Sequence, residues 1–258
     1  MVAVQLAGMT VPLPPEFAIR CLKADGPRIV WLIHPPGESP QVLKTWPLNP
    51  RRFLTHLLGI SAAQRTVRGN RLLGRVGIAV PELLSRPEIR FGCRGWCVDM
   101  RLSYVPGVSG WEVLQRSVQV PGGYGLQLRA VARSVGMIVG RLIRNGLFHR
   151  DLTIENFVIG VAGQVWIVDT DGVRPMRNRV RETERMLSRL AVQSLEAGMP
   201  LPVGVQRTLL RAVLRPLSRR ERSALMDRLR QQPWVRDLQS RQHCGDCSPG
   251  HRTVPETP

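Results

Sequence analysis

Three short segments near the start of the chain alternate apolar and polar residues. They cover residues 19–22, 29–33 and 42–46. Alternation of this kind is typical of strands with one buried face. Turn-forming residues separate the segments, with Asp-Gly-Pro at 25–27 and Pro-Pro-Gly at 35–37. The pattern predicts a three-stranded antiparallel meander.

A helix and further strands are predicted after the meander. Residues 60–76 have helical character, Ser61 is a suitable N-cap, and two internal glycines weaken the segment. Strand-like runs follow near residues 89–91 and 96–102.

The pattern then becomes mainly helical. Tyr-Val-Pro-Gly at 104–107 is a hinge candidate, and residues 111–114 begin a short helix. Residues 126–145 carry apolar side chains at a period of 3.6, which predicts a helix packed on a core and ended by Gly146.

The remaining segments predict a hairpin followed by three helices. Apolar runs at 157–159 and 165–168, split by glycines, are typical of a hairpin. The helices are predicted at 182–195, at 205–214, and from a capping box at Ser218 to about residue 230.

These elements predict an α+β protein with two lobes. Residues 1–103 would form a small, mainly antiparallel strand lobe with one helix, and residues 104–238 a larger helical lobe. Residues 239–258 are rich in Pro, Gly, Ser and polar groups, and we expect them to be disordered. A chain of 258 residues can bury a sizeable core in this arrangement.

Charge points to an anionic partner. The chain has 37 basic and 19 acidic residues, a net charge of +18. Nucleic acid, an anionic membrane face or a phosphorylated substrate would suit this surplus. Only Lys23 and Lys44 are lysines, so coding bias is an alternative explanation for the arginines, but not for their excess over acids. With two Tyr and five Phe, nucleic-acid binding is disfavoured.

The sequence also bears on cellular location. No apolar run approaches the roughly 20 residues of a membrane-spanning helix. The first residues lack the basic region of a signal peptide. We expect a cytoplasmic protein with reduced thiols. Cys244 and Cys247, with His243 and His251 beside them, have the spacing of half a zinc site, but thiols in a loose tail are the simpler interpretation.

Residues 146–175 carry the clearest chemistry. His149, Arg150 and Asp151 follow one another, Asn156 comes five residues after Asp151, and Asp169 comes eighteen after it. The predicted hairpin would bring these side chains together. Phosphoryl transfer needs a carboxylate near the acceptor hydroxyl, and an Asn and an Asp to hold Mg²⁺ on the nucleotide phosphates.

This segment resembles the catalytic and metal-binding segment of the protein-kinase-like fold. The alternative is that Asp151 caps a helix and that Asp169 lies in a polar turn. In kinases a lysine on the third strand holds the α- and β-phosphates, and Lys44 lies on the third predicted strand. The phosphate-covering loop would be the turn at residues 24–28, which lacks the GxGxxG pattern.

One departure from the kinase pattern puts full activity in question. Kinases pair the strand lysine with a glutamate of the following helix, but no Asp or Glu occurs between Glu38 and Glu82. Gln64 or Thr66 occupies the corresponding region. Helix signals resume soon after Asp169, with no Ala-Pro-Glu, which favours a small-substrate kinase over one that docks a protein chain.

Over roughly residues 20–195 the chain resembles the bacterial lipopolysaccharide core kinases of the Kdo/WaaP type. The specific matches are HRDLTIENFVI at 149–159 and VWIVDTD at 165–171. The resemblance implies transfer of phosphate from ATP, with Mg²⁺, to Kdo or heptose of the lipid A-core glycolipid. It places the protein peripherally at the cytoplasmic face of the anionic inner membrane.

By the same resemblance, Asp151 is the catalytic base, Asn156 and Asp169 are metal ligands, and Lys44 is the phosphate anchor. Asp171 matches the second acid of the D-x-D, and Thr170 replaces an aromatic residue. A pseudokinase acting as a binding module, a Ser/Thr protein kinase and a nucleic-acid-binding protein remain as alternatives.

Overall fold

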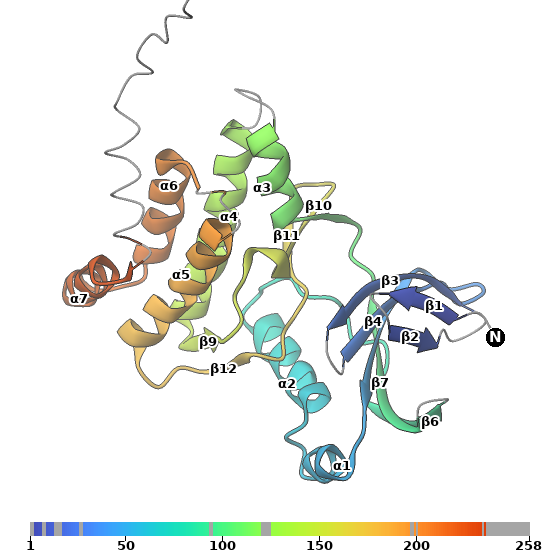
Figure 1. The fold of residues 1–258 in the computed structure, drawn as a ribbon. Helices are drawn as coiled ribbons and strands as arrows, with labels where there is room; N and C mark the ends of the chain where they lie inside the picture. Colours follow the sequence, from blue (N-terminus) through green and yellow to red (C-terminus); the bar gives the residue numbers. More distant parts are fainter. Residues whose placement is uncertain are drawn as a thin grey trace, which may run out of the picture.

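The computed structural model describes residues 3–6, 9–12, 17–25, 28–92, 95–119, 125–196, 199, 201–233 and 235. Figure 1 shows two parts, a twisted antiparallel sheet and a group of helices, which confirms the predicted two-lobed α+β fold. The predicted tail and both Cys244 and Cys247 lie outside the described residues. In the part of the chain that the structure describes, no helix is long and apolar enough to cross a membrane.

The sheet of the first lobe has five strands in the order β3-β4-β5-β7-β6, all antiparallel. The strands are β3 (Ala18–Asp25), β4 (Arg28–Ile33), β5 (Gln41–Pro47), β6 (Glu88–Gly92) and β7 (Gly95–Ser103). The predicted meander is therefore confirmed. A separate hairpin joins β1 (Ala3–Leu6) and β2 (Met9–Pro12).

Two helices follow β5, of which the sequence predicted the second. The helix α2 (Ala62–Arg75) begins at Ser61, whose hydroxyl accepts a hydrogen bond from the Gln64 amide. The preceding helix, α1 (Pro50–Leu57), was not predicted. Asn49 caps it and Pro50 opens its first turn, which are helix-start signals that the sequence contains.

The second lobe contains five helices among the described residues. They are α3 (Gly110–Gln119), α4 (Gly125–Arg144), α5 (Arg179–Glu196), α6 (Val203–Leu214) and α7 (Arg219–Arg230). Ser218 and Glu221 form the predicted capping box of α7.

Short strands frame the loop motif between α4 and α5. They are β8 (Gly107–Ser109), β9 (Leu147–His149), β10 (Phe157–Gly160), β11 (Val165–Ile167) and β12 (Val173–Pro175), with a 3-10 turn at Ile154–Asn156. The predicted β10–β11 hairpin is confirmed, and β8 pairs with β10 from the other side. β9 pairs with β12.

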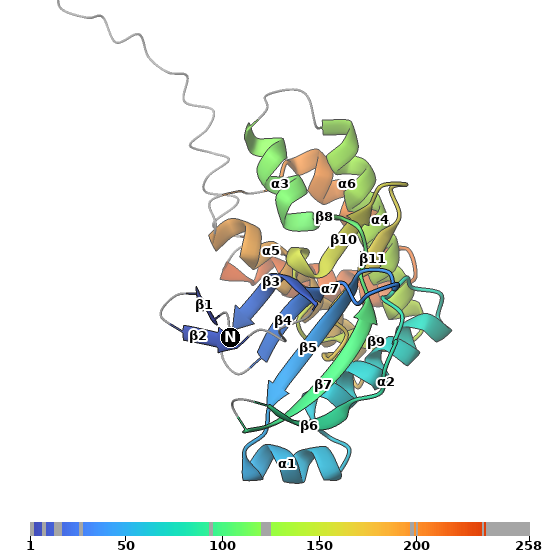
Figure 2. The same ribbon diagram turned by 90° about the vertical axis from the view of Figure 1, so that its right-hand side faces the viewer.

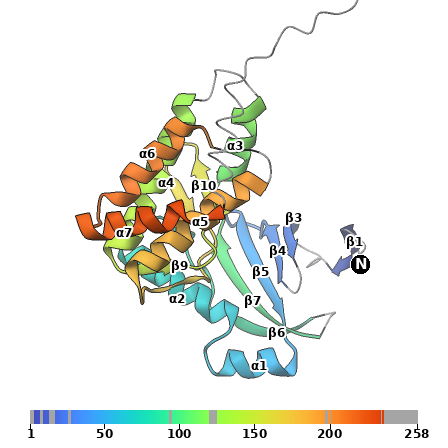
Figure 3. The same cartoon turned by 60° about the vertical axis from the view of Figure 1, so that its left-hand side comes forward.

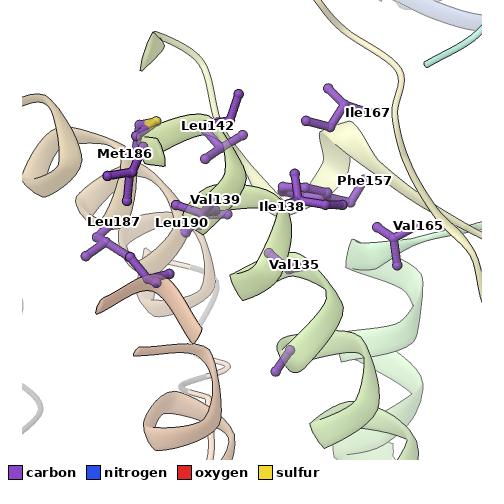
Figure 4. Packing of buried hydrophobic residues seen from close by; sticks show 14 of the residues in the cluster. Val135, Ile138, Val139, Leu142, Phe157, Val165, Ile167, Met186, Leu187 and Leu190 are labelled. Carbon is purple, nitrogen blue, oxygen red and sulfur yellow. The ribbon is translucent and has the colours of Figure 1, made fainter. Parts of the chain in front are cut away.

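The core of the helical lobe fixes this loop region in place. Figure 4 shows the apolar face of α4 packing between α5 on one side and the β10–β11 hairpin on the other. Val139, Leu142, Phe157 and Ile167 are completely buried. Burial of each such side chain stabilises the fold by about 1.5–3 kcal/mol. The loop between β9 and β10 therefore adjoins the main hydrophobic core of the helical lobe.

Candidate active site

A cleft of about 410 Å³ lies between the sheet and the β10–β11 hairpin. Figures 2 and 3 show that β3, β4 and β5 face the helical lobe across this region. Its apolar lining comes from both sides, with Val30 and Val42 from the sheet and Val158 from the hairpin. Tyr104 and Val105 line it where the chain passes between the lobes.

The polar end of the cleft contains both lysines of the chain, Lys23 and Lys44, together with Arg28. Lys44 is buried, and its ammonium donates to the Val168 carbonyl at 3.3 Å. It also lies 3.5 Å from the carboxylate of Asp169. An ion pair across the cleft thus connects β5 of the first lobe with the loop after β11.

Asp169 is held by two cations at once. Its second carboxylate oxygen accepts a hydrogen bond of 3.0 Å from Arg28. Burial acts to raise the pKa of Asp169, but Lys44 and Arg28 outweigh burial and lower this pKa to about 2. Asp169 is therefore a carboxylate throughout the physiological pH range, as a metal ligand must be.

The loop after β9 carries the other two predicted residues, Asp151 and Asn156, and of these two only Asn156 lines the cleft together with Asp169. Asn156 lines the same cleft, and its side-chain NH₂ donates to the Asp151 carbonyl at 2.7 Å. The Asp151 carboxylate accepts a hydrogen bond of 2.8 Å from Arg150 and is 40% exposed. Asp151 therefore keeps part of its carboxylate open to solvent.

His149 is buried, and one nitrogen of its ring lies 2.8 Å from the Asp169 backbone carbonyl. Burial lowers the pKa of His149 despite the nearby carboxylates, which favours a neutral ring. This contact ties the loop that carries Asp151 to the segment that carries Asp169. A neutral, buried imidazole in this place supports the backbone.

The segment after Asp169 is seated directly on α2. The Thr170 hydroxyl donates to the Thr66 carbonyl at 2.9 Å, and both threonines are buried. A Cβ atom added at Gly69 would lie only 1.8 Å from the Thr170 carbonyl oxygen. The glycine that weakens the helix as a sequence signal is thus required for the close approach of these two backbones.

Asp171 also faces α2, where Arg65 lies 3.8 Å from its carboxylate. Arg150 lies 3.7 Å from its other oxygen. Burial and the neighbouring charge of Asp169 raise the pKa of Asp171. In kinases the corresponding helix supplies a glutamate that pairs with the strand lysine. In this chain α2 instead supplies Arg65, which pairs with Asp171, the second acid of the Asp-Thr-Asp segment.

Arg28, Arg65 and Gly69 are the site residues that sequence reasoning missed. Arg28 ends the turn expected to cover the phosphates, and residues 26–27 of that turn lie outside the described residues. Its pairing with Asp169 spans 141 residues of sequence, for which no local pattern exists.

Other metal chemistry has no support in the described residues. The Cys97 thiol donates toward the Arg90 carbonyl at 3.5 Å, and no group of three or more His, Cys, Asp and Glu side chains occurs among the described residues. The site around Asp169 instead offers few, oxygen-bearing groups, which suits a Mg²⁺ ion that also binds nucleotide phosphates and water.

Comparison with known proteins agrees with the resemblance found in the sequence. No family model matches the chain. A curated relative, the 3-deoxy-D-manno-octulosonic acid kinase of Xylella fastidiosa (strain 9a5c), is 27% identical over 114 residues. That match covers 44% of this chain and 42% of the relative's length.

A solved structure of WaaP in complex with acyl carrier protein has the same fold, with a TM-score of 0.59 and 17% identity. The superposition covers 88% of this chain and 89% of that one. The chain thus has the fold of a WaaP structure along most of its length, and over less than half of its length it is similar in sequence to a Kdo kinase.

Proposed function

We propose that the chain is an ATP- and Mg²⁺-dependent kinase that phosphorylates Kdo or heptose of the lipopolysaccharide inner core. The observation that carries this proposal is the contact between Lys44 and Asp169 across a cleft that Asn156 also lines. Each of these three residues has the chemistry that a Mg-nucleotide needs.

The cleft can accept ATP in one orientation. Its apolar walls, Val30, Val42 and Val158, suit the adenine ring, and Tyr104 lies where the lobes join. The phosphates would then reach the polar end, where Lys44 anchors them. Arg28 would supply a second phosphate contact in place of a glycine-rich loop, since a guanidinium can bind two phosphate oxygens together.

Asn156 and Asp169 would hold Mg²⁺, which neutralises charge on the phosphates when it is bound. The hydrogen bond from the Asn156 amide to the Asp151 carbonyl leaves the amide oxygen as the ligand. Asp151 would accept the proton of the sugar hydroxyl. His149 would position Asp169 through its backbone carbonyl.

The contacts of Arg65 with Asp171 and of Thr66 with Thr170 would replace the missing glutamate in attaching α2 to the metal-binding segment. In kinases the glutamate holds the helix in its active position. Here the same helix is attached to the metal segment by other contacts, so the absence of the glutamate does not by itself favour a pseudokinase.

The acceptor would be the lipid A-core glycolipid, met at the cytoplasmic face of an anionic inner membrane. The net charge of +18 supports this partner, because each basic residue near such a surface contributes about 1 kcal/mol of attraction. A Ser/Thr protein kinase is the less favoured enzyme, because α5 begins only ten residues after Asp169 and leaves little room for an activation segment.

The test is Mg-ATP binding and phosphate transfer by the purified protein, with Kdo-bearing lipid A as acceptor. Asp169→Asn should abolish Mg²⁺-dependent ATP binding, whereas Asp151→Asn should keep binding and lose at least about 100-fold in turnover. Asp227→Asn, at an exposed acid of α7, is the matched control. Binding of ATP without transfer to any acceptor would favour the pseudokinase, and no binding at all would refute the enzyme.

A further inference from the structure

The helix α1 exposes its apolar residues and buries a polar one. His56 is the buried residue of this helix, and its ring lies 3.1 Å from the Ser61 hydroxyl. Leu54 and Leu57, in contrast, are 57% and 63% exposed. A surface helix of a soluble protein usually shows the opposite arrangement.

Exposed apolar side chains are concentrated around this helix. Of the thirteen large hydrophobic residues exposed in the described part of the chain, seven lie on α1, the turn after it and the β6–β7 end of the sheet. They are Phe53, Leu54, Leu57, Leu58, Ile60, Phe91 and Trp96. We call this set the α1 patch. In Figures 2 and 3, α1 lies beside the β6 end of the sheet, away from the helical lobe.

The two parts of the α1 patch are joined through the backbone and through ring contact. The Leu48 amide, just before α1, donates to the Trp96 carbonyl at 2.8 Å. Trp96 and Phe91 pack edge to face, with ring centroids 5.3 Å apart. A tryptophan with one apolar face and one polar N–H suits a membrane–water interface.

Arginines border the α1 patch at both ends of the helix. Arg51 and Arg52 are exposed in its first turn. At its other end, Arg68 donates to the Gly59 carbonyl at 2.7 Å, and Arg65 donates to the Ile60 carbonyl at 2.9 Å. Four arginines therefore lie at this border, and residues 39–81 contain no acid, so the border is positively charged.

We propose that the α1 patch is the surface by which the protein docks on an anionic lipid membrane. Apolar side chains bordered by arginines are the pattern of a helix lying in the interface, with its apolar side among the acyl chains and its cations among the phosphates. The charge of the border is what selects a lipid surface over a second copy of this chain, which would bring the same cations together. The α1 patch would make the membrane contact of the proposed function. It rests on that function only for the identity of the membrane.

The experiment is co-sedimentation of the full chain with phosphatidylcholine vesicles, with and without about one third phosphatidylglycerol. We expect binding to the anionic vesicles only. Leu54→Ser/Leu57→Ser should lower the partition coefficient on the order of tenfold or more, from the loss of apolar burial. Arg51→Gln/Arg52→Gln should lower the partition coefficient about 30-fold and make it less dependent on salt concentration.

Two matched controls carry the same chemical changes elsewhere. Met137→Ser/Val161→Ser removes exposed apolar residues of the helical lobe, and Arg185→Gln/Arg189→Gln removes exposed charge from α5. Both should bind vesicles within about twofold of the unchanged protein, since the effect depends on position. Equal losses in controls and patch variants would overturn the proposal, because attraction would then come from net charge alone.

Three further results distinguish membrane docking by the α1 patch from dimerisation and from failure of the kinase proposal. Failure to bind anionic vesicles overturns it, whatever the kinase assay gives. A dimer by light scattering that Leu54→Ser/Leu57→Ser makes monomeric also overturns it, in favour of a second copy as the occupant. Unchanged Mg-ATP affinity in the patch variants is expected, so failure of the kinase proposal would appear separately, as loss of nucleotide binding in the unchanged protein.

Discussion

Replacement of Arg28 by glutamine tests whether this arginine lowers the pKa of Asp169 and binds nucleotide phosphate. The guanidinium donates to Asp169 at 3.0 Å and is one of two cations that lower the pKa of that carboxyl from 3.8 to about 2. The net depression corresponds to about 2 kcal/mol, and because burial opposes it, Lys44 and Arg28 together contribute more than this. The carboxyl is largely buried, at 18% exposed, so screening by solvent is limited.

We expect Arg28→Gln to raise the pKa of Asp169 toward 3.8 and to weaken Mg-ATP binding by about 10- to 100-fold. The second effect follows because a charge-assisted hydrogen bond to phosphate is worth about 1.5–3 kcal/mol. Isothermal titration gives the affinity, and carbon-13 NMR of the Asp169 carboxyl gives its pKa. Arg90→Gln, which breaks an exposed pair with Glu88 on the same sheet, is the control.

The affinity decides between two interpretations of the Arg28 contact. If Arg28 binds phosphate, its removal weakens Mg-ATP binding while Mg²⁺ still reaches Asp169. Tighter Mg-ATP binding in Arg28→Gln would refute this reasoning, because it would mean that the arginine competes with the metal for the carboxylate. An unchanged affinity would equally refute a phosphate contact.

Three further substitutions test the support of the site. Gly69→Ala should cost about 1–3 kcal/mol in urea denaturation and weaken Mg-ATP binding, because its Cβ would meet the Thr170 carbonyl at 1.8 Å; Gly74→Ala, in open space on the same helix, should stabilise by about 0.5–1 kcal/mol. Leu142→Ala, at a fully buried core position, should cost about 2–5 kcal/mol by thermal or urea unfolding. Glu182→Gln should cost about 2 kcal/mol at neutral pH, because the buried carboxylate accepts from an arginine and two backbone amides. Burial acts to raise the pKa of Glu182, but these hydrogen bonds lower it below 4.5, so its stabilising effect is full above pH 4.5 and is lost as pH falls through the folded pKa. Unfolding curves of the glutamine variant and the unchanged protein should therefore converge in acid, and a constant difference down to pH 2 would contradict the assignment.

Local patterns were sufficient to predict most elements of the fold. The strand at 29–33 and the helix at 126–145 lie where their patterns predicted them, because each contributes apolar side chains to a core. The strand also buries Val30 on its opposite face, toward the cleft. The helix α1 was missed for the converse reason. Its apolar residues face solvent, and it buries His56, so its periodicity does not match a packed helix.

Local patterns predicted some residues of the candidate site and missed others. Asp151, Asn156 and Asp169 lie within nineteen residues of sequence, on a loop and hairpin that a short motif can specify. The contacts of Asp169 with Arg28, and of Thr170 with α2, join segments more than a hundred residues apart. Such contacts depend on how the two lobes meet, which no local pattern encodes. The roles assigned to Asp151, Asn156, Asp169 and Lys44 remain predictions for the experiments above.

The chain has only two lysines, and both line the cleft between the sheet and the β10–β11 hairpin. Amine-directed reagents, which on most proteins modify many surface positions, would here meet Lys23 and the buried Lys44 as the only side-chain amines, because the other 35 basic residues are arginines. An acyl phosphate of ATP would therefore act as a nearly site-specific label for this protein. Protection of these two positions by Mg-ATP, followed by peptide mass spectrometry, would report on occupancy of the cleft in a crude extract.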